Sequence, residues 1–187
     1  MTEPAVITPS DFTIARPAPG EYAPYHDRYI SLVAGNDILA TLDQQRRDTL
    51  LLLSGRDESE GDFRYASDKW SVKEVLGHVC DTERILAYRG LRVSRADQTP
   101  IEGFEQDDYV RNGPFPRRML PDLIEDYIAV RRATLTLFRN LDESAWARRG
   151  VANKNEITVR ALAYIIAGHE LHHRQVLEEK YFSASAA

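Results

Sequence analysis

The sequence predicts an all-α protein that folds as a four-helix bundle. Four segments of roughly 18–25 residues repeat their apolar residues at the 3.6-residue spacing of an amphipathic helix. Strand signals are weak along the whole chain, and no internal repeat or low-complexity tract is present. The chain has 187 residues, which is enough for one domain with a substantial core. Helices without strands bury their apolar faces against one another, so a bundle is the expected architecture.

Residues 1–36 are expected to form an extended or irregular N-terminal arm. They contain five prolines and show no helical periodicity. Tyr22, Tyr25 and Tyr29 are the side chains through which this arm can pack along the body of the protein. We therefore divide the chain into an arm, 1–36, and a single four-helix domain, 37–187.

Capping residues mark where the predicted helices begin. Ser71 is followed three residues later by Glu74, which is the spacing of a capping box. Asn36 or Asp37 is expected to cap the first helix, and Thr158 or the polar run before it begins the last. The helices are predicted at about residues 37–54, 71–92, 120–141 and 157–181.

Two connections are long for a bundle, in which short loops are usual. They comprise residues 55–70 and 93–119. The second connection is long enough to carry the chain from one end of the bundle to the other. Because long loops often carry function, residues 93–119 are also a candidate lid or substrate wall.

Composition and charge exclude several classes of protein. Hydrophobic residues make up 43% of the chain and charged residues 28%, as in ordinary globular proteins. The net charge of −5 argues against nucleic acid as the main partner, because binding to phosphates needs a basic surface. We find no signal peptide and no stretch of about 18 apolar residues, so we expect no membrane partner and a cytoplasmic location. A single cysteine, Cys80, excludes an intramolecular disulfide.

His169, Glu170 and His173 stand in the order H-E-x-x-H, which is the zinc-protease signature. The extended form of this signature requires glycine and histidine at positions 176 and 179, where the chain has Val176 and Glu179. Glu179 lies on the same predicted helix and is poorly placed to complete a tetrahedral site with the two histidines. A protease is therefore disfavoured, although another kind of metal enzyme is not.

A helical wheel places both histidines within the apolar face of the last helix. At about 100° per residue, His173 lies about 40° from His169, and both fall among Leu162, Ile165 and Val176. One interpretation is that both are core histidines with hydrogen-bond partners nearby. Two buried imidazoles without partners are costly, however, and a metal ion accepts the lone pairs of both.

His78, on the second predicted helix, is the candidate third ligand. Glu74 and Asp81 lie on its polar side, about 40–60° around the helix, where carboxylates that orient a ligand imidazole are expected. Cys80 lies about 200° from His78, so we expect it to point away from the metal and to pack. His26 falls in the arm and is expected to be a surface or packing residue. One histidine facing two gives a three-histidine site with an open position.

Two stretches together carry a resemblance to a known family. "KWSVKEVLGHVCDTERIL" (69–86) and "AGHELHHRQVLEEKY" (167–181) resemble the DinB-like, or YfiT-like, four-helix-bundle metalloproteins. The marks are the Trp-Ser-x-Lys-Glu-x-x-x-His start of the second helix and the His-x-x-x-His near the end. "FEQDDYVRNGPF" (104–115) resembles the region before that family's third helix. The resemblance covers about residues 37–183 and implies a bundle of the DinB/YfiT-like type.

The resemblance also implies a metal site and an activity. The metal-binding histidines of the family match His78, His169 and His173. Glu170 is not required by that pattern, so the H-E-x-x-H order is interpreted as accidental. Zinc suits three histidines, and nickel, iron or manganese are also acceptable. Family members are described as metal-dependent hydrolases, and some branches use low-molecular-weight thiols as bacillithiol or mycothiol transferases and isomerases. A homodimer is a further expectation from the family.

Two functions remain open on these grounds. The first is a metal-dependent enzyme that activates water or a thiol for hydrolysis or thiol transfer on a small molecule. Glu74, Asp81 and Glu170 are its candidate groups for proton transfer or for orienting the imidazoles, and a solvated surface charge is the alternative for each. The second function is a non-catalytic, metal-binding stress-response bundle. An enzyme requires an open position beside a concave mouth, whereas a structural site is closed, with His172 as the candidate fourth ligand.

Overall fold

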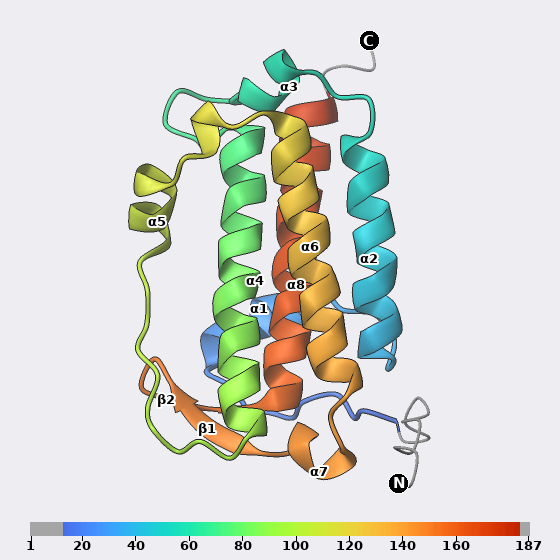
Figure 1. Ribbon diagram of the computed structural model, residues 1–187, viewed down its shortest axis with the longest axis vertical. Coiled ribbons are helices and arrows are strands. Elements are labelled where there is room, and N and C mark those ends of the chain that lie inside the picture. The colour runs from blue at the N-terminus through green and yellow to red at the C-terminus, as the bar shows by residue number, and fades with distance from the viewer. Residues whose placement is uncertain (1–12, 184–187) are drawn as a thin grey trace, which may run out of the picture.

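Four long helices run side by side in the computed structural model, which describes residues 13–183 (Figure 1). They are α2 (Ile38–Leu53), α4 (Val72–Ser94), α6 (Leu120–Arg139) and α8 (Val159–Val176). Helices α2 and α4 each pack against both α6 and α8, so α2 and α4 occupy opposite corners of the bundle. Helices α2 and α8 run towards one end and α4 and α6 towards the other (Figure 1). The predicted all-α four-helix bundle is confirmed.

The helices begin at the capping residues that the sequence indicated. The side chain of Asp37 accepts a hydrogen bond from the amide of Ala40, and Ser71 and Glu74 form the predicted capping box. Thr158 caps α8, two residues later than its predicted start, and α8 continues as a π-helical segment, η3 (Leu177–Phe182). Among the described helices, none is both long and apolar enough to cross a membrane.

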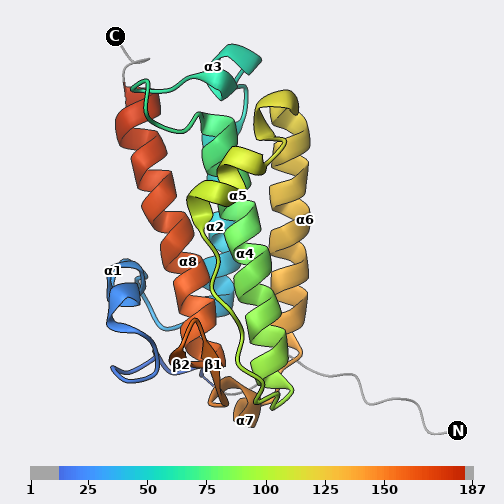
Figure 2. The same ribbon diagram turned by 90° about the vertical axis from the view of Figure 1, so that its left-hand side faces the viewer.

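The long connection after α4 carries the chain back along the length of the bundle, as predicted. It starts at the end of the bundle where α4 stops and reaches the opposite end, where α6 begins (Figure 1). On its way it forms α5 (Gln106–Asn112) and a 3₁₀ turn, η2 (Phe115–Arg117), beside α4 (Figure 2). The shorter connection between α2 and α4 contains α3 (Glu58–Asp62).

A β-hairpin precedes α8, and the expectation of a chain without strands was wrong at this point. After α7 (Glu143–Trp146), strand β1 (Arg149–Ala152) pairs antiparallel with β2 (Asn155–Thr158). Asn153 and Lys154 join the strands with positive φ angles of 47° and 65°. This is the two-residue turn whose twist matches that of paired strands, and asparagine tolerates it well. The strands are too short for an alternating pattern to be recognised in the sequence.

The arm packs against the bundle through a short helix. Of the predicted arm, residues 1–12 lie outside the described residues. The remainder contains a 3₁₀ turn, η1 (Pro24–His26), followed by α1 (Asp27–Ile30), which lies against α8 (Figure 2). Tyr29 is buried as expected and Tyr22 packs against the core, but Tyr25 is 57% exposed, so its expected packing is wrong.

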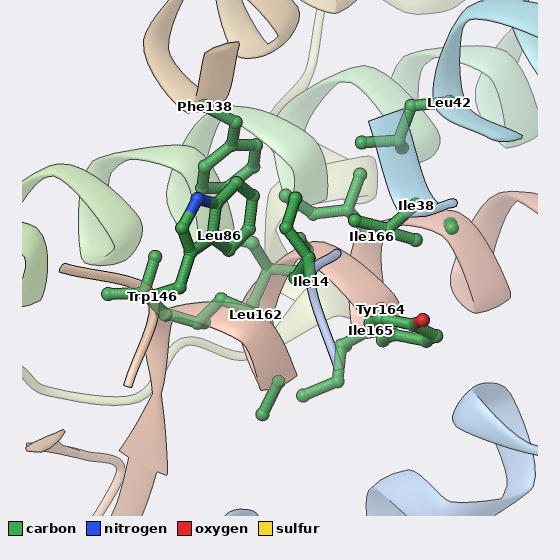
Figure 3. Close-up of a cluster of buried hydrophobic side chains, with 14 of the residues drawn as sticks. Ile14, Ile38, Leu42, Leu86, Phe138, Trp146, Leu162, Tyr164, Ile165 and Ile166 are labelled. Carbon is green, nitrogen blue, oxygen red and sulfur yellow. The ribbon is translucent and has the colours of Figure 1, made fainter. Parts of the chain in front are cut away.

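Two clusters of buried apolar side chains fill the bundle. One lies near the hairpin, where Phe138, Trp146 and Leu162 meet residues of the arm such as Ile14 (Figure 3). The other lies towards the opposite end and includes Cys80, whose side chain packs there as predicted. Burial raises the pKa of the Cys80 thiol, so this residue has no reactive thiolate at neutral pH.

Candidate metal centre

Three imidazoles meet where α4 and α8 pack together. His78 comes from α4, and His169 and His173 come from α8. One nitrogen of each ring lies within 4.8 Å of the corresponding nitrogen of the other two. The Nε2 atoms of His78 and His169 are 3.0 Å apart, and the ring centroids of His169 and His173 are 4.5 Å apart. The structure thus brings together the three histidines that the sequence singled out, across 91 residues of chain.

The spacing and chemistry of the three nitrogens fit a divalent metal ion. Zinc holds imidazole nitrogens at about 2.0–2.1 Å, so two ligands of a tetrahedral site lie about 3.3 Å apart. The 3.0 Å separation between the His78 and His169 nitrogens is close to that value. Three imidazoles are also a donor set that zinc, nickel, iron and copper accept. These residues therefore have the donor atoms and the proximity to hold such an ion.

Burial keeps the three imidazoles neutral, which is the form that binds metals. Burial, and to a lesser extent the nearby His172, lower the pKa of His78 to about 4. Burial and the neighbouring histidines hold the pKa values of His169 and His173 well below the usual value of histidine. At neutral pH each ring therefore presents a lone pair instead of competing for a proton.

A glycine precedes two of the three histidines and lets another element approach closely. A methyl group on Gly77, before His78, would lie 2.3 Å from the ring of Phe115 in η2. A methyl group on Gly168, before His169, would lie 2.0 Å from the backbone oxygen of Tyr29. The crossover and the arm can therefore cover the helices beside the histidines.

Aromatic rings border the imidazoles on two sides. The ring of Trp70 lies 4.8 Å from that of His78, measured between centroids. On the other side, the ring of Tyr29 lies 5.3 Å from that of His169 in an edge-to-face arrangement. These apolar surfaces exclude water from the flanks of the site and hold the imidazole orientations by packing.

Two cavities open beside the histidines. One has a volume of about 470 Å³ and is lined by His169. The other has a volume of about 400 Å³ and is lined by His173 and His172. Asp107 in α5 contributes to both, so the crossover forms a wall of the site, as its length suggested. Volumes of this size suit small molecules.

His172 does not join the three ligands. Its side chain is exposed, and no nitrogen of it belongs to the group that lies within 4.8 Å. Its ring instead contacts those of His173 and Tyr29 at centroid distances of 5.0 and 5.7 Å. Within residues 13–183 the geometry thus corresponds to three protein ligands beside open space, and not to a closed four-ligand site.

Two of the three predicted carboxylates have partners away from the histidines. Glu74 completes the capping box with Ser71 and lies 2.7 Å from Arg64 in an ion pair. Asp81 accepts a hydrogen bond of 3.2 Å from Arg84 on the surface of α4. Neither bonds to a ligand imidazole within the described residues.

Glu170 belongs to a buried polar network that joins all four long helices. Its carboxylate accepts hydrogen bonds from Thr49 of α2 at 2.6 Å and from Tyr127 of α6. Arg131 of α6 binds it at 2.5 Å and also binds both oxygens of Glu83 of α4, each at 2.8 Å. The carboxylate of Glu170 thus points towards α2 and α6 and binds their side chains, and not the imidazoles beside which it was expected.

The charged side chains of the network stay ionised because each is paired with a charge of opposite sign. Burial acts to lower the pKa of Arg131, but Glu170 and Glu83 outweigh it and hold that pKa well above its usual value. Arg131 and Glu83 were not among the residues that the sequence singled out. The spacing nevertheless indicates that Arg131 is buried. It follows Tyr127 by one helical turn and precedes Leu135 by one turn, so it lies within the apolar stripe of α6.

Comparison with known proteins identifies the family. The family model described as the DinB superfamily matches residues 41–177. No curated protein matches the chain. A solved structure, "YfiT from Bacillus subtilis is a probable metal-dependent hydrolase with an unusual four-helix bundle topology", is similar with a TM-score of 0.72. Its sequence is 16% identical to this one, and the match covers 90% of this chain and 97% of that chain. At this identity the similarity shows that the two proteins share a fold. The chain belongs to the DinB superfamily.

Proposed function

We propose that the protein is a metal-dependent enzyme that acts on a small molecule, with one divalent ion held by His78, His169 and His173. The observation that carries this proposal is the convergence of three neutral imidazoles, two buried and one partly exposed, at the border of two cavities. A site that only stabilised the fold would have no need of open space beside it. The similarity to YfiT, itself named a probable metal-dependent hydrolase, supports the same class.

The ion would supply the activation of the nucleophile, and the protein would supply the shape of the site. A divalent ion on three neutral imidazoles keeps its full double charge, which acidifies a water molecule or a thiol at neutral pH. The chain contributes the walls of the site, in which Trp70 and Tyr29 limit the access of water to the imidazoles. The cavities orient the substrate relative to the histidines.

The nucleophile is expected to come from water or from a substrate thiol. Cys80 is buried in the core with a raised pKa, so it cannot serve as the attacking group. Hydrolysis and transfer of a low-molecular-weight thiol are the two reactions that follow from these two nucleophiles. Glu74, Asp81 and Glu170 have other partners, and the proposed function gives them no part in proton transfer.

The metal content of the purified protein tests the site. Protein made without a histidine tag should contain about one divalent ion per chain by elemental mass spectrometry. His78→Ala should lose it, because two imidazoles on one helix bind far more weakly than three. His172→Ala is the matched control and should keep its ion, since His172 lies outside the ligand group.

The results discriminate between the alternatives. Metal that is indifferent to His78 would contradict the three-histidine site. Loss of metal in His172→Ala would favour the closed site of a non-catalytic bundle. If the site is confirmed, the loaded protein should be assayed with esters and amides, and with thiols and electrophiles. Turnover that disappears in His78→Ala would then assign the reaction class.

A further inference from the structure

The cavity that reaches His169 is lined by both apolar and polar side chains. We call it the His169 cavity. Its apolar lining includes Tyr29, Leu86, Phe104 and Ile165. Exposed polar residues line its solvent side, and besides His169 three polar side chains that are not exposed, His26, Thr82 and Arg89, line it as well. Polar groups placed within a partly apolar cavity usually orient a ligand.

Arg89 is a buried cation that contacts no acidic side chain in the described part of the chain. Its side chain is 6% exposed, and its Nε has no hydrogen-bond partner among the described residues. Within these residues the guanidinium donates one hydrogen bond, from Nη2 to the backbone oxygen of Glu102 at 2.8 Å. A buried charge satisfied only by one carbonyl is unfavourable, and burial accordingly lowers the pKa of Arg89.

The other two buried cations in the described part of the chain, Lys73 and Arg131, have the acidic partners that Arg89 lacks there. Lys73 lies 2.7 Å from Glu58 and 2.8 Å from Asp62. Arg131 pairs with Glu83 and Glu170 in the network described above. Each of these two cations therefore has two carboxylates, whereas Arg89 contacts none within residues 13–183. The fold pairs its buried cations except at the one that lines the cavity.

Two further unpartnered groups line the same cavity as Arg89. The hydroxyl oxygen of Thr82 and the Nδ1 atom of His26 are buried and have no hydrogen-bond partner within the described residues. Burial, and then the charges of Arg89 and Arg28, lower the pKa of His26 to about 4, so its ring is neutral at pH 7. Three unsatisfied polar groups around one cavity point to a ligand that satisfies them.

We propose that the His169 cavity binds a small substrate that carries a carboxylate, and that Arg89 is the residue that binds this carboxylate. Guanidinium and carboxylate groups match in charge and planar geometry, and a carboxylate would occupy the free Nε. Thr82 and His26 supply additional hydrogen bonds to the same ligand. The proposal rests on the proposed function in that it places the reacting end of the substrate at His169.

The rim of the cavity favours a carboxylate over a phosphate. Glu105, Asp107 and Glu156 also line the cavity, but all three are exposed, and the one hydrogen bond that Arg89 donates within residues 13–183 goes to a backbone oxygen. They lie on its solvent side, where water and salt partly screen them. Their repulsion acts more strongly on a doubly charged phosphate than on a singly charged carboxylate.

The spacing along α4 indicates how far the carboxylate lies from the reacting group. His78, Thr82 and Arg89 follow one another on the same face of α4, because eleven residues correspond to about three turns. The rise from His78 to Arg89 is about 16 Å, part of which the long arginine side chain spans. The substrate should therefore carry its carboxylate several bonds away from the group that reacts.

Binding of a model ligand tests the proposal without an activity assay. The probe is 4-phenylbutyrate, compared with its neutral amide, on wild-type protein by titration calorimetry and by amide chemical shifts. We expect the carboxylate to bind roughly tenfold more tightly than the amide. The shifts should cluster at Thr82, Arg89 and Gly103. Arg89→Met should abolish the preference, and Arg95→Met, at the exposed end of the same helix, should retain it.

Treatment with EDTA separates this proposal from the metal site. The preference for the carboxylate should persist in EDTA-treated wild-type protein, because Arg89 acts independently of the ion. A preference that survives in Arg89→Met but disappears with EDTA would place the carboxylate at the histidines and overturn the proposal. Equal binding of acid and amide to wild-type protein, or tighter binding of phenylphosphonate than of phenylbutyrate, would also overturn it. The shift mapping on wild-type protein holds even if Arg89→Met fails to fold.

Discussion

Adjacent residues of α8 serve unrelated purposes. His169 faces α4 and the cavity, while Glu170 faces α2 and α6 and binds Arg131. One helical step of about 100° separates the two directions. The H-E-x-x-H order thus contains two metal-ligand candidates and one member of a structural ion network. A glutamate that acts as a protease base needs a carboxylate free to act beside the metal, and here Thr49, Tyr127 and Arg131 occupy it.

Glu170→Gln should destabilise the fold and spare the metal site. Removing one partner of a buried ion pair costs about 3–5 kcal/mol, because Arg131 keeps its charge. We expect a loss of this size in urea unfolding, with the metal content per folded chain unchanged. Glu179→Gln, on an exposed position further along, is the control and should be near neutral. A folded Glu170→Gln protein without metal would instead give Glu170 a role at the site.

At the scale of elements, the arm and the crossover complete the site that α4 and α8 begin. Helix α1 lies against α8 because Gly168 has no side chain to keep the backbone of Tyr29 away. The crossover lies against α4 in the same manner, with Phe115 over Gly77. Both elements contribute walls to the cavities, through Tyr29 and Asp107 respectively. Segments outside the four long helices thus determine the shape of the substrate space.

Gly168→Ala should detach the arm from α8. The added methyl group would lie 2.0 Å from the backbone oxygen of Tyr29, which a rigid backbone cannot accommodate. We expect a loss of about 1–3 kcal/mol in unfolding free energy and faster proteolysis within residues 13–36. Gly61→Ala is the matched control, because its methyl group meets the flexible side chain of Lys73 at 3.1 Å. Unchanged proteolysis of Gly168→Ala would show that the arm does not depend on this contact.

At the scale of the whole molecule, a polar layer divides the bundle core. Gln45, Glu83, Arg131 and Glu170 lie, along their respective helices, between members of the two apolar clusters. A slip of any helix past its neighbours would bury these charges among apolar side chains. The layer therefore sets the register of α4 against α8, and with it the approach of His78 to the two histidines of α8.

The metal-free protein should lose stability as the pH falls from about 6.5 to 5. The folded pKa of His78 is lowered to about 4, and those of His169 and His173 are also low. In this pH window the histidines of the unfolded chain, which titrate near 6.5, become protonated, whereas the three histidines of the folded protein stay neutral. Unfolding free energy should fall by up to ~1.4 kcal/mol per pH unit for each such histidine.

Urea titrations of EDTA-treated protein at several pH values measure this dependence. The control is a variant in which all three histidines are replaced by alanine, and its stability should change less over the same interval. Equal slopes for the two proteins would mean that the imidazoles are protonated as easily in the folded protein as in the unfolded chain.

Much of the fold could be predicted because its determinants are local. Helix periodicity, the capping box at Ser71 and the caps at Asp37 and Thr158 depend on neighbours within a few residues. The three histidines could be predicted for the same reason, since their positions on the helix faces follow from spacing, with the family resemblance supplying the pairing. The hairpin before α8 was missed because four-residue strands carry too little pattern, and its turn residues are no stronger a signal.

The sequence by itself determined the bundle, its helix starts and the candidate ligands, because these follow from spacing along single helices. Only the tertiary structure decided the partner of each buried charge. It paired Glu170 with Arg131 and placed Arg89 away from any acidic partner among residues 13–183. It also brought the arm and the crossover to the rim of the cavities. Such pairings join residues far apart in the chain, and their energies depend on burial and distance, which no local pattern contains.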